Sequence, residues 1–417
     1  VLIIGGGIVG CSVAYHLTKL GCSDVVLLEQ GQLSCGTTWH AAGLVGQLRA
    51  TQNQTELAKY TRDLYLSLEE ETGLATGYRS TGSISVARTP EREEELKRQA
   101  GMAAAFGVDV ERLSFKEAKE KAPLLNTDDL VAAYLIPSDG MTNPTDTTQA
   151  LARGARNGGA KIFEGVKVSE ILTHEGRAIG AKTDKGRIEA EVVVVCAGMW
   201  TRELCAPLGV DVPLHAAEHY YIVTRPIEGV LRNQPVLRDM DGYIYIKEEV
   251  GGLVLGGFEP HAKPWGMEGI PDGFEFQALP EDWDQFEVFM NTGLERIPAL
   301  AEAEIRQLFV GPESFTPDNR YILGEAPDLR RLYVAAGFNS IGIQSAGGAG
   351  KALAEWIVED APTMDLAELD IRRFHRFERN RAYLFDRTKE SLGLLYAMHW
   401  PFRQPETGRG ARRSPFH

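Results

Sequence analysis

His40 and His219 are the side chains of this sequence best suited to chemistry near neutral pH. An imidazole has an unperturbed pKa of about 6.5, so it can hold a proton or attack as a neutral nucleophile. His40 ends the segment Gly36-Thr-Thr-Trp-His40, which is rich in small residues. A lone histidine beside a tryptophan in an apolar loop is more often packed and hydrogen-bonded than reactive. The residues by themselves leave both interpretations of His40 open.

The segment His215-Ala-Ala-Glu218-His219 fits the H-x-x-E-H pattern of inverted zincin metalloproteases. That chemistry requires both histidines on one face of a helix. Pro213 precedes the segment and the apolar run Tyr220–Thr224 follows it, which predicts a strand. Residues four apart on a strand share a face but lie too far apart to bind one zinc ion. We expect no metal here, and His219 is either a polar group in a substrate site or a hydrogen-bonded core residue.

The glycine-rich run Gly347-Gly-Ala-Gly350-Lys351 resembles a phosphate-binding P-loop but lacks two required residues. Ser345 stands where the first glycine should be, and Ala352 replaces the Ser or Thr that would bind Mg²⁺. We expect instead that this run starts a helix whose N–H groups approach a cofactor ring. The sequence contains no G-x-S-x-G nucleophile elbow, so an ordinary hydrolase is unsupported.

The first residues of the chain predict the element that holds these side chains around a nucleotide. Three glycines at the G-x-G-x-x-G spacing, Gly5, Gly7 and Gly10, separate the apolar run Val1–Ile4 from a helical pattern. The first allows a tight turn, the second lets backbone approach a pyrophosphate, and the third lets the helix pack against the strand. A second apolar run ends at Glu29, which would bind ribose hydroxyls and disfavour a 2′-phosphate. Together these features predict a dinucleotide site without distinguishing NAD from FAD.

The pattern of a strand followed by glycine recurs in the middle and near the end of the chain. Four consecutive valines lead to Ala197 and Gly198, and the apolar run Tyr333–Ala336 leads to Gly337. Residues 220–258 between them are rich in short strands. We predict an α/β + α+β fold: a discontinuous Rossmann-like domain with an antiparallel-sheet substrate domain.

Helix signals outside the nucleotide unit are also clear. Leucines at helical spacing over Thr55–Thr72 end at Gly73, a helix stop. Ser114-Phe-Lys-Glu117 reads as a capping box, and Pro144–Asn157 begins with a proline suited to the first turn.

The length and composition of the chain restrict the classes of protein to which it can belong. The chain has 417 residues, enough for two domains or one elaborated domain, and a net charge of −14, which disfavours a broad nucleic-acid surface. No apolar run reaches the ~20 residues that span a bilayer. We expect no nucleic-acid partner and a location in the bacterial cytoplasm or the mitochondrial matrix. The five cysteines form no C-x-x-C pair, which indicates a reducing compartment; they are Cys11, Cys22, Cys35, Cys196 and Cys205.

Several segments resemble the FAD-dependent sarcosine and dimethylglycine dehydrogenases, and the likeness spans nearly the whole chain. The most specific are Gly36–Leu44 and Gly311-Pro-Glu-Ser-Phe-Thr-Pro-Asp318, which are closer to the sarcosine dehydrogenases. The resemblance implies a flavoprotein fold similar to that of D-amino-acid oxidase. The remaining segments that carry it are the glycine fingerprint with Glu29, Cys196-Ala-Gly-Met-Trp200, Gly324–Asp328, Gly337–Ser340 and Asp370–His375.

The resemblance assigns the nucleotide to FAD and implies covalent attachment through His40, because the histidine of this segment bears the flavin in the family. A neutral imidazole nitrogen would attack the 8α-methyl carbon of the flavin. The residues assigned to cofactor binding are Gly5, Gly7, Ile8, Val9, Gly10, Glu29, Gln30, Gly36, Thr37, Thr38, His40, Ala42, Gly43, Leu44, Val168, Ala197, Gly198, Trp200, Gly337, Gly342 and Ile343.

The resemblance also implies oxidation of an N-methyl group on a small amino acid, sarcosine or dimethylglycine. The amine must be neutral to release a hydride from its methyl carbon to flavin N5, so the site must accept a proton. His219 and Tyr245 match family positions on the substrate side of the flavin, and we expect them to handle and orient the amine. Arg49 is our candidate for binding the substrate carboxylate, with a surface salt bridge as the alternative.

We predict an FAD-binding domain of residues 1–80, 140–214 and 305–360, and a substrate domain of residues 81–139 and 215–304. Residues 361–417 would form a helical extension and a linker toward the folate-binding half that family members usually carry. Tetrahydrofolate is expected only if that half exists.

Two other functions compete with a dehydrogenase that passes electrons to an electron-transfer flavoprotein or a similar acceptor. One is an amine or D-amino-acid oxidase of the same fold that is reoxidised by O₂. The other is a non-catalytic regulatory protein that kept the flavoprotein fold. Such a protein should have lost the flavin-linking histidine, whereas His40 is present.

Overall fold

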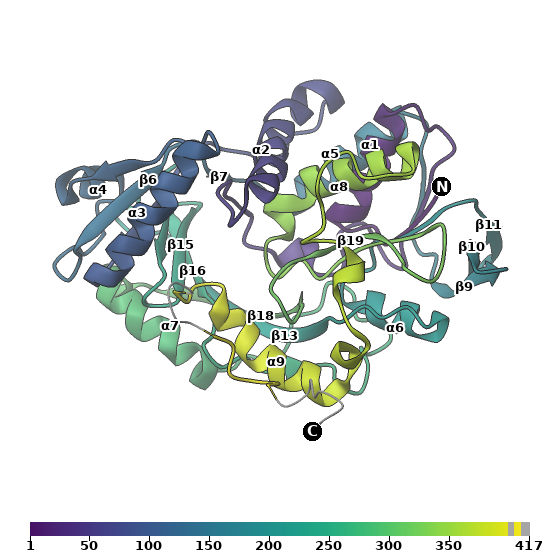
Figure 1. Ribbon diagram of the computed structural model, residues 1–417. Helices are drawn as coiled ribbons and strands as arrows, with labels where there is room; N and C mark the ends of the chain where they lie inside the picture. The colour runs from purple at the N-terminus through teal and green to yellow at the C-terminus, as the bar shows by residue number, and fades with distance from the viewer. Residues whose placement is uncertain (399–403, 410–417) are drawn as a thin grey trace.

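The computed structural model describes residues 1–398 and 404–409, which form two sheet-based parts side by side (Figure 1). One part is a six-stranded sheet in the order β19-β20-β12-β1-β2-β8, parallel except for β19. Its strands are β1 (Leu2–Ile4), β2 (Val26–Leu28), β8 (Lys161–Phe163), β12 (Val193–Val195), β19 (Ile322–Glu325) and β20 (Leu332–Ala336). The run of valines is fully buried because both faces of this sheet are covered.

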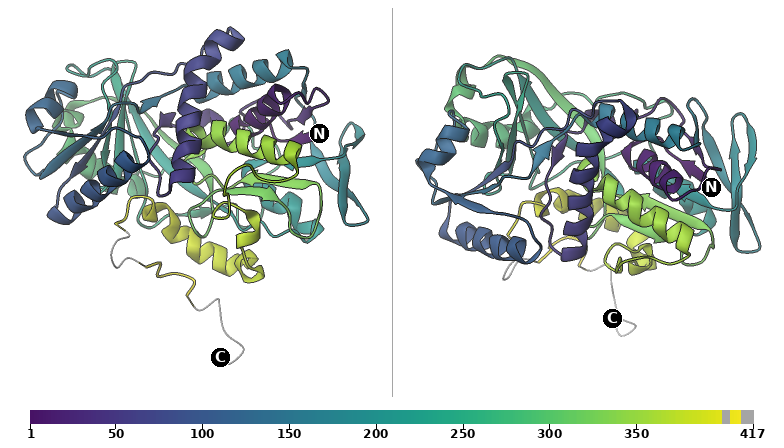
Figure 2. Two further views of the ribbon diagram at one scale, coloured as in Figure 1. Left: turned by 45° about the horizontal axis from the view of Figure 1, so that its top comes forward. Right: turned by 90° about the horizontal axis from the view of Figure 1, so that it is seen from above.

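One face of the six-stranded sheet is covered by helices and the other by a β-meander (Figures 1 and 2). The helices are α1 (Ile8–Lys19), α2 (Gln52–Thr72), α5 (Pro144–Asn157) and α8 (Gly342–Glu359). The meander strands are β9 (Val168–His174), β10 (Arg177–Thr183) and β11 (Gly186–Glu189).

The glycine-rich run at 347–351 does not start a helix, so that prediction is wrong. Helix α8 begins at Gly342, and the run lies inside it. A Cβ on Gly348 would lie 2.2 Å from the carbonyl oxygen of Leu57, and one on Gly350 would lie 2.2 Å from Ser12 Oγ. These glycines therefore allow α8 to pack closely against α2 and α1, and the residues of this helix that line a cavity are its first two, Gly342 and Ile343.

The second part is a nine-stranded sheet in the order β17-β13-β16-β15-β14-β4-β6-β5, with β18 pairing the other side of β13. Its strands are β4 (Ser83–Ala87), β5 (Glu111–Leu113), β6 (Ala132–Ile136), β13 (His215–Thr224), β14 (Val236–Asp239), β15 (Ile244–Glu249), β16 (Gly252–Gly257), β17 (Pro264–Trp265) and β18 (Ile305–Phe315). One face packs against α7 (Trp283–Arg296) through Phe286 and Phe289. The H-x-x-E-H segment lies in β13, which confirms the strand prediction.

Residues 305–315 pair with β13 along its whole length, so hydrogen bonding joins them to the substrate sheet rather than to the FAD-binding range predicted for them. The other domain boundaries remain a prediction.

The remaining elements are short strands, helices and 3₁₀ turns outside the two main sheets. They are β3 (Leu44–Val45), β7 (Gly140–Met141), α3 (Pro90–Ala105), α4 (Phe115–Lys121), α6 (Thr201–Cys205), α9 (Arg381–Leu394), and the 3₁₀ turns η1 (Thr38–His40), η2 (Gly198–Trp200), η3 (Ala206–Leu208), η4 (Pro298–Glu302), η5 (Ile371–Arg373) and η6 (Arg376–Arg379).

Several local predictions are confirmed by the helix ends. Ser114 and Glu117 form the reciprocal capping box of α4. Gly73 ends α2 with φ of +72°, and α5 spans Pro144–Asn157 with Asn143 as its N-cap. In the described ranges no helix is long and apolar enough to cross a membrane. The predicted linker beyond residue 409 lies outside those ranges.

Candidate functional site

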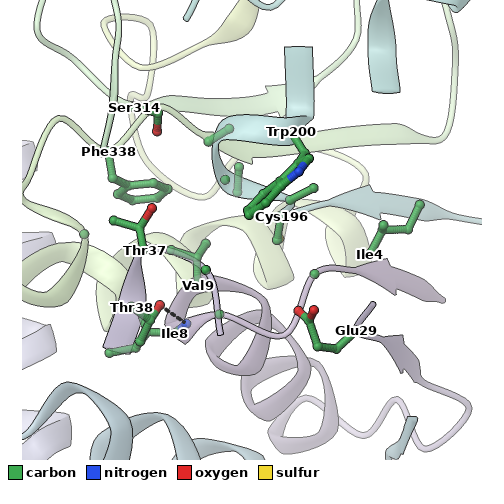
Figure 3. Close-up of a pocket in the computed structure, with 18 of the residues that line it drawn as sticks. Ile4, Ile8, Val9, Glu29, Thr37, Thr38, Cys196, Trp200, Ser314 and Phe338 are labelled. Carbon is green, nitrogen blue, oxygen red and sulfur yellow. Dashed lines mark hydrogen bonds between the residues drawn. The ribbon is translucent and has the colours of Figure 1, made fainter. Parts of the chain in front are cut away.

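A cavity of about 480 Å³ opens where β1, β2, β12 and β20 of the six-stranded sheet end (Figure 3). This is where doubly wound sheets bind nucleotides, because the glycine turns and helix N-termini point there. Most of the residues predicted to bind the cofactor line it: Gly5, Gly7, Ile8, Val9, Glu29, Gln30, Gly36, Thr37, Thr38, Val168, Ala197, Gly198, Trp200, Gly337, Gly342 and Ile343.

The three glycines of the fingerprint have different surroundings. Gly5 has φ of +110°, and a Cβ there would lie 2.4 Å from the carbonyl oxygen of Cys196. A Cβ on Gly10 would lie 2.0 Å from the carbonyl oxygen of Gly5. Gly7 faces the cavity, and its nearest neighbour would be Thr38 Oγ1 at 3.1 Å. Gly5 and Gly10 are thus required by packing, whereas Gly7 leaves room for a ligand.

The N-terminus of α1 offers an anion-binding position beside this room. Gly7 is its N-cap and provides no side-chain hydrogen bond, and the first turn carries no acidic residue. The N–H of Ile8 donates to Thr38 Oγ1 at 3.2 Å, as the dashed line in Figure 3 shows. The positive end of the helix dipole therefore faces the cavity without a side chain that would neutralise it.

Glu29 lines the cavity and also holds the glycine turn. Its buried carboxylate accepts hydrogen bonds from the N–H of Gly6 at 2.6 Å and of Gly31 at 2.9 Å. The thiol of Cys35 donates to the same carboxylate at 3.4 Å. Since an ionised carboxylate can accept about four hydrogen bonds, it retains capacity for ribose hydroxyls.

The opposite wall of the cavity comes from the turn between β20 and α8. Asn339 and Ser340 have positive φ values of 49° and 60°. The Asn339 side chain is fully buried, accepts from Thr316 N at 2.8 Å and donates to the Gly337 carbonyl oxygen at 2.6 Å. Backbone held in this sparsely populated region is typical of ligand sites, and these hydrogen bonds maintain it.

Sequence reasoning missed a second group of lining residues. Some stand inside the resembling segments and could have been found there, whereas Val166, Lys167, Ser169, Glu203 and Leu204 carry no recognisable signal. The missed residues are Ile4, Leu28, Cys35, Ala41, Val166, Lys167, Ser169, Cys196, Glu203, Leu204, Glu313, Ser314, Ala335, Ala336, Phe338, Asn339 and Ser340.

Five predicted cofactor residues lie outside the cavity lining: Gly10, His40, Ala42, Gly43 and Leu44. Gly43 forms a turn with φ of +78°, where a Cβ would lie 2.2 Å from the Thr142 carbonyl oxygen. Ala42 and Leu44 pack against a cluster that contains Tyr245 and therefore face the substrate sheet.

His40 is buried in η1, between the cavity-lining residue Thr38 and the substrate sheet. Its ring lies 5.2 Å from that of Phe309 on β18, and a Cβ on Gly311 would lie 2.8 Å from its Cε1. Burial, and then the nearby His219, lower the pKa of His40 to about 3. The imidazole is therefore neutral near pH 7, as a nucleophile must be.

One face of the nine-stranded sheet brings together His219, Tyr245 and a third residue, Arg238. In the register of the sheet, His219 stands opposite Gly311, while Tyr245 stands opposite both Gly256 and Arg238. Directly opposed residues on neighbouring strands point to the same face. Because the Tyr245 hydroxyl would lie 2.4 Å from a Cβ on Gly256, this glycine makes room for the phenol.

At one end of this face His219 lies between two buried carboxylates. Its Nδ1 is 3.8 Å from Glu259 Oε2. Within residues 1–398 and 404–409, neither His219 Nδ1, nor the carboxylate of Glu259, nor Glu313 Oε2 has a hydrogen-bond partner. Burial favours neutral His219, but the two carboxylates outweigh it and raise its pKa above the usual value. Burial also raises the pKa of Glu259.

The other end of the face is basic. Arg49 donates to the carbonyl oxygens of Leu48 and Gly46, both at 2.8 Å, and no described carboxylate lies within ion-pair distance of it. Burial, and then the nearby Arg238, lower the pKa of Arg49 to about 10. Arg238 Nη2 would lie 2.8 Å from a Cβ on Gly46, and its buried Nε has no partner among the described residues. The surface salt bridge that was the alternative for Arg49 is therefore not formed within the described part of the chain.

An aromatic wall separates the two charged ends. Phe258 lies 5.2 Å from the His219 ring and 6.2 Å from that of Tyr245. Tyr396, which follows α9, packs edge-on against Phe258 at 4.7 Å, and its carbonyl oxygen accepts from Arg92 Nη2. Burial raises the pKa of Tyr245 well above its usual value, so its hydroxyl is protonated.

Residues 1–356 match the family described as FAD dependent oxidoreductase, and residues 359–414 match its central domain. The chain belongs to the FAD-dependent oxidoreductase family. The predicted family and fold are thus confirmed, and Tyr396 comes from the part that matches the central domain.

Curated relatives of the family match the whole chain. It is 44% identical over 416 residues to a formaldehyde-forming 4-methylaminobutanoate oxidase of Paenarthrobacter nicotinovorans, covering 100% of this chain and 50% of the relative. It is 43% identical to the mitochondrial pyruvate dehydrogenase phosphatase regulatory subunit of Mus musculus, covering 100% and 48%. It is 40% identical to the mitochondrial sarcosine dehydrogenase of Homo sapiens, covering 100% and 46%. The chain thus spans about half the length of these relatives.

Solved structures of the family share the fold. The L-proline dehydrogenase from P. horikoshii superposes with a TM-score of 0.81 at 26% identity and covers 90% of this chain and 97% of that one. A glycine oxidase from Geobacillus kaustophilus gives a TM-score of 0.76 at 27% identity, with coverage of 90% and 98%.

The cavity fits the FAD that the family requires. The room at Gly7, the uncapped start of α1 and the Glu29 carboxylate suit a pyrophosphate and a ribose. Glu313 both lines the cavity and belongs to the acidic end of the substrate face. The cavity and this face therefore adjoin at Glu313.

Proposed function

We propose that this chain oxidises the N-methyl group of a small amino acid, sarcosine or dimethylglycine, with FAD as the hydride acceptor. The observation that carries the proposal is the substrate face. It has unpaired arginines at one end, a buried histidine with carboxylates at the other, and adjoins the FAD cavity through Glu313. Two relatives above 39% identity are named for N-methyl amino acid substrates, which supports this class.

The arginine end would bind the substrate carboxylate. Arg238 is close enough to Arg49 for its guanidinium to disfavour the charge of Arg49. The nearest carboxylate, Asp139, already accepts from Gln47 N at 2.9 Å and from Ser83 Oγ at 2.6 Å. A substrate carboxylate placed between two arginines would relieve their repulsion and form charge-assisted hydrogen bonds.

The histidine end would handle the amine. His219 accepts the proton that the amine must lose before a hydride can leave its methyl carbon. Its pKa, raised above the usual value, lies closer to physiological pH. Tyr245 remains a protonated hydroxyl and orients the amine by hydrogen bonding.

We also propose that His40 holds FAD covalently. Its neutral imidazole and its position between the cavity and β18 support this assignment. In acid-denatured protein, flavin should remain on the wild-type chain and be released from His40→Ala. Flavin that leaves the wild-type chain would contradict the covalent bond but not FAD binding.

The test of the function is anaerobic reduction of the bound flavin in the full-length protein. We expect bleaching of the flavin absorbance by sarcosine, dimethylglycine or 4-methylaminobutanoate, with formaldehyde as a product. One methyl group changes the binding free energy in a pocket by only about 1–3 kcal/mol, so the three substrates must be ranked by the rates at which they reduce the flavin. No reduction by any N-methyl amino acid would favour the regulatory alternative, since one relative is a regulatory subunit.

The electron acceptor, the folate-binding half and the location stay predictions. Comparing reoxidation by O₂ with reoxidation by an electron-transfer flavoprotein separates the oxidase from the dehydrogenase. Relatives include both mitochondrial and bacterial proteins, so both predicted locations remain.

A further inference from the structure

Glu259 is the most completely buried unpaired carboxylate beside the substrate face. It follows β16, has no exposed surface, and neither of its oxygens has a hydrogen-bond partner in the described ranges. Its only ionic neighbour among the described residues is His219, at 3.8 Å. Glu313 reaches the same histidine from β18 and also has an oxygen without a described partner.

The charges of this cluster do not cancel. Even with a protonated His219, two carboxylates face one cation. Among the described residues, the other titratable groups that act on the cluster are Tyr245 on β15, Tyr220 and Tyr221 on β13 and the neutral His40 on η1, none of which carries a positive charge. Burying an uncompensated carboxylate costs several kcal/mol, which is why burial raises the pKa of Glu259, and a bound cation would offset this cost.

The shape of the loop indicates that Glu259 is held in place rather than free to turn outward. A Cβ on Gly393 in α9 would lie 2.7 Å from Pro260 Cα and 3.0 Å from the carbonyl oxygen of Glu259. The N–H of Ala262 donates to the carbonyl oxygen of Lys389 in the same helix at 2.8 Å. Helix α9, which lies beneath β13 and β18 in Figure 1, thus clamps the loop against the sheet.

We propose that Glu259 and Glu313, on either side of His219, form a subsite that binds the substrate's amino group as a cation. This inference rests on the proposed function and adds the form in which the substrate binds: a zwitterion, with its ammonium group at the acidic cluster and its carboxylate at Arg49 and Arg238. The two charged ends then orient the N-methyl group without a residue that recognises the methyl itself.

The subsite also supplies the proton acceptor. An ammonium N–H bond breaks, its electron pair stays on the amine nitrogen, and the proton forms an N–H bond at His219 Nδ1. The imidazolium that results is stabilised by Glu259 at 3.8 Å. Glu259 is therefore a positioning residue for this step, and it contacts the bound cation directly before the step.

The test compares two ligands of the same shape that are not oxidised. Trimethylglycine carries a permanent positive charge on its nitrogen, and 3,3-dimethylbutanoate has a neutral quaternary carbon at the same position. Titration calorimetry on the full-length FAD-loaded protein should show the cation binding about 10- to 100-fold more tightly, as expected for a charge-assisted contact. Glu259→Gln should reduce this preference and retain FAD, because Glu313 remains, and Glu259→Asp should restore part of what is lost.

Glu248→Gln is the matched control, because Glu248 is an equally buried carboxylate of the same sheet but is paired with Arg79 at 2.9 Å. It should leave the preference unchanged. A Glu259→Gln protein that keeps the full preference for the cation would overturn the subsite. Equal binding of both ligands by the parent protein, with N-methyl amino acids still oxidised, would overturn the subsite alone. Binding of neither ligand would overturn the proposed function as well.

The pH profile provides a readout that a merely structural role would not change. Loss of the Glu259 charge lowers the pKa of His219, so the acid limb of kcat/KM should move to lower pH in Glu259→Gln. An acid limb at the parental position would show that Glu259 does not act on His219.

Discussion

The FAD cavity is formed mainly by backbone groups, whereas the substrate face is formed by side chains. The backbone groups of the cavity, here called the FAD cradle, are the glycine turn and the start of α1, and the Glu29 carboxylate holds the turn through two N–H groups. The substrate face uses side chains from strands β13, β14, β15 and β18 and from the loop after β16. The cradle is therefore sensitive to added volume, whereas the face is sensitive to lost charge.

Added volume at Gly10 should have the largest effect. A Gly10→Val side chain has no space, because its Cβ would begin 2.0 Å from the Gly5 carbonyl oxygen. We expect loss of folded, FAD-loaded protein, measured as flavin content and thermal unfolding. Gly101→Ala is the control, since no atom lies within 4 Å of its Cβ position. A Gly10→Val protein with full flavin content would show that the turn relaxes.

Loss of His219 should leave the cradle intact and remove the proton acceptor. We expect His219→Ala to retain FAD and to lower kcat by about 10²–10⁴-fold, the usual contribution of general base catalysis. Flavin absorbance and steady-state kinetics measure the two properties separately. His174→Ala, at an exposed histidine of β9, should change neither. Parental kcat in His219→Ala would remove its assigned role.

Loss of one arginine should weaken substrate binding and have a smaller effect on the chemical step. Arg238→Ala removes one of two guanidinium groups, so we expect KM for the amino acid to rise by about 10- to 100-fold. The exposed Arg232→Ala is the matched control. If KM is unchanged while the protein stays folded, the carboxylate binds elsewhere.

The smallest expected effect is the pH dependence of flavin attachment. A pKa of about 3 means that His40 gains a proton only in strong acid, so the attacking nitrogen is neutral throughout pH 5–8. The rate at which apoprotein incorporates FAD in acid-stable form should be flat over this range. An acid limb near pH 6.5, the ordinary pKa of histidine, would show that the imidazole is solvated during attachment.

Features that depend on neighbours in the sequence were predictable. The capping box at Ser114 and the helix over Pro144–Asn157 follow from local hydrogen bonding and backbone restriction, and both are observed. The wrong prediction at the glycine-rich run also came from considering only neighbours in the sequence. Gly347–Gly350 resembles a helix start locally, but its glycines serve contacts with α1 and α2 that are distant in the sequence.

Sequence alone determined the dinucleotide cradle, the strand nature of His215–His219 and, through resemblance, the family. It did so because a glycine turn and the carboxylate that supports it act on backbone within one supersecondary unit. Only the tertiary structure decided that Arg238 lies beside Arg49 and that Glu259 and Glu313 flank His219. Strand register and the packing of α9 bring these charges together, and no spacing along the chain encodes either one.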